Sequence, residues 1–489
     1  MAVQENNWYR LDNAAKLFPA VSTVTATNVF RLTCRLYEDV SQETLQKAVE
    51  QALDETPSFK VRLRKGVFWY YFEQNTNTPK VTEEHSYPCR KLDKYTNNAY
   101  LFDVTYCGKY INVEFFHALC DGTGAAAFFS KIITSYLILA HENELPPVLE
   151  SVDSGVSHPA MNEDSFVRIT RKGNVKGENM VRESAYNSSS TLTQNGEIKV
   201  IKGIMSVNQL KSFAKAKNAT ITEALAGVLI YSLYNESFRY EPVNRSIDVC
   251  IPVNLRKFFP SDTIRNFFTT IGAGVNFYEK EYTLDEIIAK VSQDMRGELT
   301  PEKIYPKIMY CVNAQKNLAL RFVPLFLKNL ALRITFAKGE KGFSLVLSNL
   351  GQFNIPKEIE PYVERFEFLL SPTLNSRYKT SACSFKDTFV YSFTTNIENT
   401  EVQRKFFAIL REHGIDVTIS CNSTEVDKGT DALQKSIDRK QLKSDKKALR
   451  KQNKLDRRAS KKQNKLDRRA LKKQRRSDKK SAKKRGDSK

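Results

Sequence analysis

Apolar side chains in the first part of the chain follow two spacings, one typical of helices and one typical of strands. Residues 41–53 carry them at helical spacing, with Ser41 in position for an N-cap, so we predict a helix there. Residues 110–116 alternate apolar and polar side chains, which predicts a strand, and residues 125–140 form a strongly apolar segment that predicts a helix. Further strands are predicted at 21–37, 59–63 and 67–72.

A second series of strands and helices follows a stretch with little periodicity. Residues 151–197 are rich in Ser, Asn, Gly and Glu, a composition typical of a linker. After it, Thr220 and Glu223 form a predicted capping box for a helix at 224–234. The other elements predicted here are strands at 198–207, 247–253, 343–347, 366–370 and 389–396, and helices at 208–217, 284–297 and 402–413. We therefore predict an α/β fold with one half at 1–185 and another at 186–427.

The charge of the chain is concentrated at its C-terminal end. Residues 428–489 contain 27 basic and 7 acidic side chains, whereas the preceding residues hold 49 and 48. The sequence KQNKLDRRA occurs at 451–459 and again at 462–470. We expect a solvated basic extension here, disordered or a single helix. The alternative is binding to RNA or an anionic membrane, because clustered Lys and Arg bind phosphates without sequence choice, so no specific DNA binding is expected.

Several features bear on the compartment and the class of protein. The eight cysteines never lie two to four residues apart, so no zinc or thioredoxin-type site is expected and no metal site is predicted. The first residues lack the apolar core of a signal peptide, and no transmembrane segment is expected. We expect a cytoplasmic protein, with peripheral membrane association as an alternative. Residues 318–337 predict a helix buried against the core, and the alternatives are that it lies on a membrane or lines an acyl-chain channel.

One histidine lies where a catalytic base is expected. His117, Asp121 and Gly122 form an HxxxDG sequence at a junction between a predicted strand and helix. The ordinary pKa of imidazole is near neutrality, as a general base requires, and the strand alternation directs His117 inward. From these residues alone, His117 as a core histidine and Asp121 as a helix N-cap remain open alternatives.

The stretch FFHALCDGTGAAAFF resembles the HHxxxDG motif of the superfamily that contains chloramphenicol acetyltransferases, condensation domains and alcohol acetyltransferases. Phe116 stands where the first histidine of that motif often lies. Other stretches resemble the superfamily in the same order: WYRLDNAAKLFPA, ETPSFKVRLRKGVFWYY, PVNLR at 252–256, RNFF at 265–268 and SNLG at 348–351. The resemblance covers about residues 8–420 and excludes the basic extension.

The resemblance implies two sandwich halves that form a pseudo-dimer around a central tunnel, with His117 at its middle. In such enzymes the histidine deprotonates an alcohol or amine, which attacks the thioester of acyl-CoA or of an acyl carrier. The partners are thus a small-molecule acyl donor and acceptor, and no cofactor stays bound. The resemblance also implies that Asp121 pairs with Arg256 and that Gly122 lets the backbone pass close to the cavity.

Two questions stay open at this level. The group that stabilises the oxyanion is unassigned, and Asn254, Asn266 and Asn349 are candidates because an amide can donate to developing negative charge. Cys120 is predicted to be a packing residue rather than a nucleophile. The alternative function is a catalytically silent binding or scaffold protein that its basic extension tethers to nucleic acid or to an anionic membrane.

Overall fold

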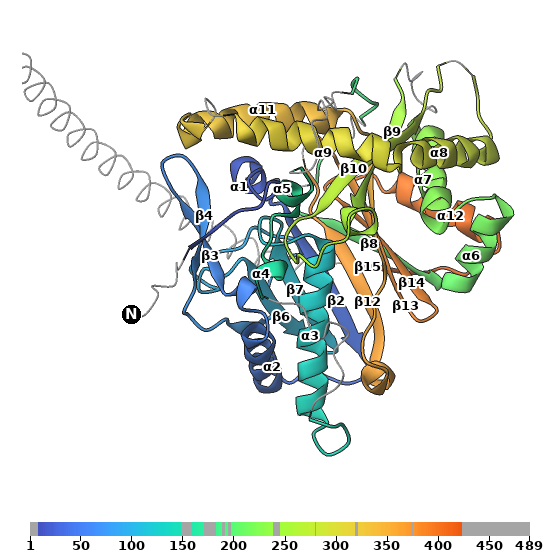
Figure 1. Ribbon diagram of the computed structural model, residues 1–489. Coiled ribbons are helices and arrows are strands. Elements are labelled where there is room, and N and C mark those ends of the chain that lie inside the picture. The colour runs from blue at the N-terminus through green and yellow to red at the C-terminus, as the bar shows by residue number, and fades with distance from the viewer. Residues whose placement is uncertain are drawn as a thin grey trace, which may run out of the picture. The chain divides into compact units, whose positions relative to one another are not determined.

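The structure is a computed structural model, and it carries two sheets that stand at the centre of the fold (Figure 1). It describes residues 8–147, 158–170, 182–187, 191–193, 197–237, 245–278, 280–317, 321–373 and 375–422. Residues Met1–Asn422 form one compact unit. The predicted basic extension at 428–489 lies outside the described residues.

The first sheet belongs mainly to the N-terminal half. Its five strands run in the order β12-β2-β7-β6-β5, and neighbours are antiparallel except for the last pair. The bounds are Val363–Leu370 for β12, Val29–Leu36 for β2, Tyr110–Phe116 for β7, Phe102–Cys107 for β6 and Val81–Glu83 for β5. Because β12 comes from the C-terminal half, the two halves are joined by a shared sheet as well as by the chain.

Two helices of the same half bury their apolar sides in one core with this sheet. Helix α2 (Gln42–Asp54) begins at Ser41, whose side chain accepts a hydrogen bond from the Thr44 amide, so the predicted N-cap is confirmed. Helix α3 (Gly122–Ala140) is, among the described residues, the one helix long and apolar enough to cross a membrane. Eight of its residues are buried, and it packs beside α2 as a core helix does.

The second sheet has seven strands in the order β10-β9-β11-β13-β14-β8-β15. Their bounds are Phe268–Val275, Ile247–Asn254, Leu345–Gln352, Tyr378–Phe385, Thr388–Thr395, Lys199–Ser206 and Thr418–Cys421. Four helices pack with this sheet in a second core: α6 (Val207–Ala216), α7 (Ile221–Ser237), α8 (Leu284–Glu298) and α12 (Glu401–Glu412). The capping box of α7 is confirmed, because the Thr220 amide donates to Glu223 and the Glu223 amide donates to Thr220.

A third, smaller sheet contributes Val61 and Phe72 to the first core, and several further helices complete the fold. The small sheet has the order β1-β4-β3, with bounds Trp8–Arg10, Tyr70–Gln74 and Val61–Lys65. The helices are α1 (Phe18–Val21), α4 (His158–Met161), α5 (Ser165–Ile169), α9 (Pro301–Lys316) and α11 (Leu325–Lys341). Single 3-10 turns occupy Pro57–Phe59, Leu255–Lys257 and Lys357–Tyr362. Figure 1 shows α11 along one edge of the unit, with the β3–β4 hairpin reaching towards it.

The structure corrects several predictions from periodicity. The strand predicted at 21–37 begins only at Val29, because Pro19 favours the short helix α1 and Asn28 has a positive φ of 54° that interrupts extended backbone. The predicted pair at 59–63 and 67–72 lies about two residues later, after the 3-10 turn that Pro57 begins. Part of the predicted linker at 151–197 is helical, in α4 and α5.

The helix predicted at 318–337 is present from Leu325, but the prediction that it is buried is wrong. Leu325 is the only buried residue of α11. Phe326, Leu330 and Ile334 are 65%, 57% and 52% exposed. An apolar pattern predicts a helix but does not show whether other elements cover it. In the structure, the side of α11 that carries Phe326, Leu330 and Ile334 is mostly exposed. The mixed α/β class itself is confirmed, whereas the central tunnel stays a prediction.

Candidate active site

The HxxxDG residues lie where β7 ends and α3 begins. The His117 amide donates to the carbonyl of Asn28, at the start of β2, at 3.0 Å, which holds the turn against the neighbouring strand. Asp121 is the N-cap of α3, and its Oδ1 accepts a hydrogen bond from the Gly124 amide at 3.0 Å. The N-cap interpretation of Asp121 is therefore correct, but capping accounts for only one of its bonds.

A buried ion pair joins this turn to the C-terminal half. Arg256 Nη1 donates to Asp121 Oδ2 at 2.7 Å and Nη2 donates to Oδ1 at 3.3 Å. The Asp121 side chain is 5% exposed and the Arg256 side chain 13%. Arg256 also donates to the carbonyls of Thr263 and Arg265, so its charge has partners on several sides. A carboxylate and a guanidinium this well satisfied form a structural clamp.

The imidazole of His117 has its own polar partner from the C-terminal half. Its Nδ1 lies 3.0 Å from Oδ1 of Asn266. The amide nitrogen Nδ2 of Asn266 donates to Asp12 Oδ2 at 3.2 Å, and its backbone nitrogen donates to the same oxygen at 3.3 Å. Because the Asn266 side-chain nitrogen donates to Asp12, the Asn266 oxygen faces His117 and accepts from Nδ1–H. This tautomer leaves the lone pair on Nε2.

Three aromatic rings lie against His117. Phe18 of α1 stacks on it with a centroid separation of 4.3 Å and an interplanar angle of 13°. Phe30 and Phe268 contact it at 5.2 and 5.3 Å. The residue is nevertheless only partly buried. Burial lowers the pKa of His117, and the Asp121 carboxylate and the bond to Asn266 oppose that shift, so the ring is neutral at neutral pH.

Four consecutive residues of the C-terminal half hold the turn. Arg265 Nη1 donates to the Leu119 carbonyl at 3.1 Å, and Asn266 contacts His117. The Phe267 amide donates to Asp121 at 2.8 Å, and Phe268 contacts the imidazole. The RNFF segment therefore positions the HxxxDG turn residue by residue. The resemblance showed only that RNFF follows the HxxxDG motif in the sequence, and it did not predict that the two segments are in contact.

The two glycines of this turn face different neighbours. A Cβ on Gly122 would meet the end of the Leu350 side chain at 2.4 Å, and a leucine side chain can move. A Cβ on Gly124 would lie 2.0 Å from the backbone carbonyl oxygen of Ile264. The close approach of backbones is thus at Gly124. Cys120, two residues before Gly122, is fully buried, and burial raises the pKa of its thiol well above the ordinary value, so it is a packing residue.

Comparison with known proteins shows the family to which the chain belongs. The family model described as Alcohol acetyltransferase matches residues 108–395, more than half of the chain, and the matched range includes the HxxxDG turn, Arg256 and the RNFF segment. This protein is a member of the alcohol acetyltransferase family. No curated protein sequence matches the chain significantly.

Solved structures resemble this alcohol acetyltransferase family member in fold. TRI101 of F. graminearum, complexed with coenzyme A and T-2 mycotoxin, is 12% identical with a TM-score of 0.58, over 84% of this chain and 99% of that one. Polyketide synthase associated protein 5 from Mycobacterium tuberculosis is 14% identical with a TM-score of 0.54, over 82% and 96%. The starter condensation domain of rhizomide synthetase RzmA is 12% identical with a TM-score of 0.51, over 84% and 98%. These likenesses show the predicted superfamily fold.

The other two candidate asparagines of this acetyltransferase family member lie in different surroundings. Asn254 caps the turn at 255–257: its oxygen accepts from the Arg256 amide and its nitrogen donates to Thr123 at 3.1 Å. Asn349 donates to Thr222 at 3.0 Å and accepts from the Gly351 amide. Asn254 is thus linked to the clamp, whereas Asn349 lies in β11 and bonds to α7.

Sequence reasoning missed two buried residues of the site, Asp12 and Arg265. Asp12 is 3% exposed and accepts from Asn266 and from the Ala15 amide. Burial raises the pKa of Asp12 to about 6, against the effect of its hydrogen bonds. Arg265 is 3% exposed, and burial lowers its pKa. Asp12 lies in WYRLDNAAKLFPA and Arg265 in RNFF, two of the stretches that resemble the superfamily. A charged residue within each of these stretches was the signal that could have indicated a buried polar role.

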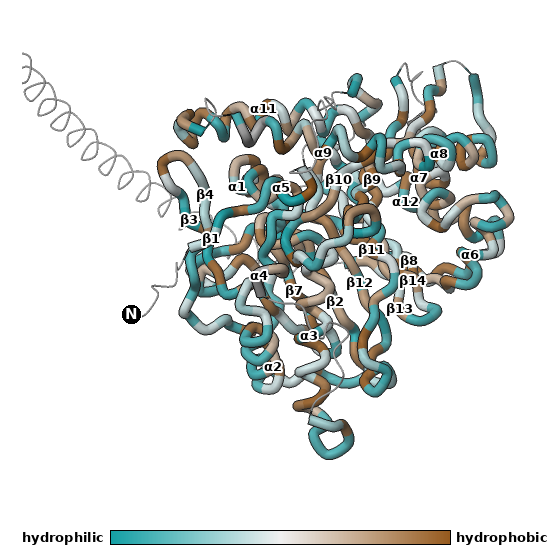
Figure 2. Tube along the Cα trace, in the orientation of Figure 1, coloured by the Kyte–Doolittle hydropathy of each residue, from teal (hydrophilic) through white to brown (hydrophobic). Residues whose placement is uncertain are grey.

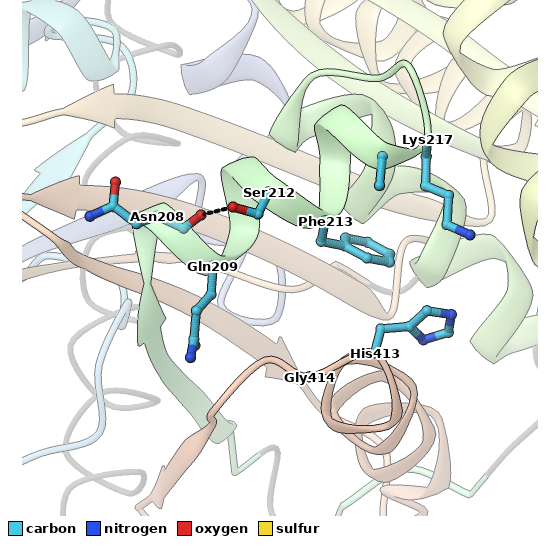
Figure 3. A pocket seen from close by; sticks show the side chains of 8 residues that line it. Asn208, Gln209, Ser212, Phe213, Lys217, His413 and Gly414 are labelled. Carbon is cyan, nitrogen blue, oxygen red and sulfur yellow. Dashed lines mark hydrogen bonds between the residues drawn. The ribbon is translucent and has the colours of Figure 1, made fainter.

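Another histidine lies in a surface depression that does not contain these residues. The depression is lined by α6 and the end of α12, and Figure 3 shows His413 facing Phe213 across it. His413 Nδ1 lies 2.8 Å from the Ile409 carbonyl, and its ring contacts Phe213 edge-on at 5.2 Å. His413 is therefore a residue that ends a helix. Among the described residues, no three His, Cys, Asp or Glu side chains are grouped to hold a metal ion.

Proposed function

We propose that this protein transfers an acyl group from acyl-CoA to an alcohol, with His117 as the general base. Membership of the alcohol acetyltransferase family supports acyl transfer to a hydroxyl rather than to an amine. The complexes of TRI101 with coenzyme A and of the RzmA domain with C8-CoA support a CoA thioester as the donor. The alternative donor is the thioester of an acyl carrier, from which the same acyl transfer to an alcohol would proceed.

The proposed reaction needs one base that acts twice. The lone pair on Nε2 of His117 removes the hydroxyl proton as the alcohol oxygen attacks the thioester carbonyl carbon. The tetrahedral intermediate then expels the CoA thiolate, the carbon–sulfur bond breaks, and the proton on Nε2 passes to the sulfur. The products are an ester and free CoA, and the imidazole returns to its neutral form.

One observation carries the proposal: the contact between Asn266 and His117 at 3.0 Å. It favours the tautomer whose free lone pair is on Nε2, and the acceptor oxygen of Asn266 stabilises the imidazolium that forms during attack. The lowered pKa of His117 supplies the neutral base at neutral pH. A buried histidine without such a partner would have no reason to hold one tautomer.

The same contact changes the role we assign to Asn266. Its oxygen accepts from the imidazole and its nitrogen donates to Asp12, so we assign Asn266 as a positioning residue for His117. Asn254 and Asn349 each use an amide hydrogen on a threonine, and each keeps a second one. Since Asn254 is linked to the clamp next to the HxxxDG turn, it is the better of the two candidates for the oxyanion.

The test is release of free CoA from a panel of acyl-CoA donors in the presence of candidate alcohols, with the ester product identified by mass spectrometry. His117→Ala should lower turnover by a factor of about 10²–10⁴, the contribution of a general base. The matched control is His413→Ala, which removes a histidine from outside the site. Equal turnover in His117→Ala and the parent protein would exclude His117 as the base. If none of the acyl-CoA donors gives an ester, the catalytically silent scaffold is favoured.

A further inference from the structure

Exposed apolar side chains gather on two neighbouring segments of the surface. Of the eighteen large apolar side chains that are exposed among the described residues, eight lie in the tip of the β3–β4 hairpin and in residues 322–334. We name these eight the α11 face: Val67, Phe68, Trp69, Phe322, Phe326, Leu327, Leu330 and Ile334. Single exposed apolar residues are ordinary, whereas a group of eight marks a binding surface.

Hydrogen bonds fasten the hairpin tip to the helix, so the α11 face is one surface. The Leu325 amide donates to the Val67 carbonyl at 3.0 Å. Lys328 Nζ donates to the Phe68 carbonyl at 3.2 Å and lies 3.5 Å from the centroid of the Trp69 ring. Figure 1 shows the hairpin approaching α11, and Figure 2 shows apolar positions in both segments.

Helix α11 exposes a row of apolar side chains along one side. Phe326, Leu330 and Ile334 follow one another at intervals of four residues and therefore share one side of the helix. Another side is held down: Leu325 is buried, and Asn329 donates to the Tyr70 hydroxyl at 2.8 Å. The exposed apolar side is thus fixed outward by bonds on a different side of α11.

Positive charge accompanies the α11 face. Residues 321–341 contain Arg321, Lys328, Arg333, Lys338 and Lys341. The single acidic residue in this range, Glu340, turns inward to Thr373 and Lys379. The hairpin adds Lys65 near its tip, whereas Arg64 pairs with Glu73 of the same hairpin. A second copy of this face or the basic residues 428–489 would bring like charges together, so neither fits as the partner.

We propose that the α11 face docks on an anionic membrane, with its apolar side chains inserted among the lipid headgroups and its basic side chains on lipid phosphates and carboxylates. Apolar side chains flanked by Lys and Arg are typical of helices that lie in the membrane interface. Helix α11 has seventeen residues and carries charges along its length, so it lies on a bilayer rather than spanning it. The proposal is independent of the transfer chemistry.

The docking surface adjoins the candidate active site through α1. Arg333 Nε donates to the Ala20 carbonyl at 2.6 Å, and Phe18 of the same short helix stacks on His117. In a protein docked by this face, the helix α1, whose Phe18 stacks on His117, therefore lies near the lipid. This placement suits an alcohol or an acyl chain that partitions into membranes.

The chain supplies its own reporter, because it has only two tryptophans, Trp8 and Trp69. In a full-length Trp8→Phe protein, Trp69 is the single tryptophan and belongs to the α11 face. We expect brominated lipids in phosphatidylserine-containing vesicles to quench its fluorescence, and vesicles of phosphatidylcholine alone to bind less protein. Co-flotation of the protein with the same vesicles gives the partition coefficient.

Full-length Phe326→Ser/Leu330→Ser should partition at least about tenfold less and lose the quenching. Full-length Tyr95→Ser/Tyr278→Ser is the control, because those tyrosines are 69% and 78% exposed elsewhere on the surface. Both proteins should have the parent melting temperature, since exposed side chains are changed. Flotation of the α11 variant equal to that of the parent, flotation without quenching of Trp69, or self-association that the α11 variant abolishes would each overturn the proposal.

Discussion

Asn266 Oδ1 lies 3.0 Å from His117 Nδ1, and the nitrogen of the same amide donates to the buried carboxylate of Asp12. Three segments far apart in the chain thus meet at one imidazole. The order carboxylate, amide, imidazole fixes how the ring is protonated, because each group determines the hydrogen-bond role of the next. The histidine of the HxxxDG turn depends on this chain of bonds.

Removing the amide should change the pH dependence of turnover. Asn266→Ala deletes an acceptor that raises the pKa of His117, so that pKa should fall further and the acid limb of the pH–rate profile should move to lower pH. The loss of the preferred tautomer should also lower kcat by about tenfold or more, with less effect on KM. The measurement is kcat and KM between pH 5 and 9. An unshifted acid limb with a reduced rate would assign Asn266 a purely structural role.

Breaking the clamp should destabilise the protein. Arg256→Met leaves the Asp121 carboxylate buried without its cation, and the free energy of unfolding should fall by about 3–5 kcal/mol. In Asp121→Asn/Arg256→Met the loss should be smaller than the sum of the two single losses, because the stranded charge is gone. Urea unfolding measures each value. Arg404→Met, at the exposed pair with Glu401, is the control and should change little. An Arg256→Met protein as stable as that control would contradict the clamp.

The two glycines of the turn should respond differently to an added methyl group. Gly124→Ala forces the methyl against the Ile264 carbonyl, so helix and loop must separate, and the melting temperature should fall clearly. Gly122→Ala meets only the end of the Leu350 side chain and should be tolerated better. Thermal unfolding of the two variants compares them directly. A Gly122→Ala protein that is the less stable of the two would show that the backbone contact is not the constraint.

Asp12 should make the protein less stable as the pH rises from about 4 to about 6. Its pKa is raised by burial from 3.8 to about 6 in the folded protein, whereas the unfolded chain has the ordinary value. Between these values the folded protein holds a proton that the unfolded chain has lost, so the free energy of unfolding falls with pH, by about 3 kcal/mol in total. In Asp12→Asn this part of the fall should disappear, as measured by urea unfolding at pH 4 and 6.5.

A matched control separates the site from the rest of the protein. Burial also raises the pKa of Asp103 to about 6. Asp103 lies in β6 and accepts a hydrogen bond from Arg90, away from the HxxxDG turn. Asp103→Asn should reduce the same pH dependence of stability while leaving the pH–rate profile unchanged. Asp12→Asn should alter both. Identical behaviour of the two variants in turnover would contradict the link from Asp12 to His117.

Local sequence was sufficient where a structural feature is local. The strand at 110–116, the turn and the helix that follows are contiguous, and their bounds were predicted to within three residues. The contact of Asn266 with Asp12 spans 254 residues, and no periodicity encodes it. The pairing of Asp121 with Arg256 came from the resemblance rather than from the pattern, and the structure brings the two together.

Exposure could not be predicted in the same way. Helices α7 and α11 are both rich in apolar residues, yet α7 is surrounded by the second core and α11 has one buried residue. Periodicity reports that a helix has an apolar side, while coverage depends on elements that are distant in sequence. Strands β6 and β13, and helix α9 with its internal Pro306, were missed because their patterns are short or interrupted.

The four-residue helix α1 has a practical consequence for work on this protein. Phe18 covers one side of the His117 imidazole, and the Ala20 carbonyl accepts a hydrogen bond from Arg333 of α11. A truncation that begins after Val21 would remove both the Phe18 ring that stacks on His117 and the carbonyl that accepts from the Arg333 guanidinium. Any N-terminal tag or truncation should therefore be placed ahead of Trp8, where β1 begins.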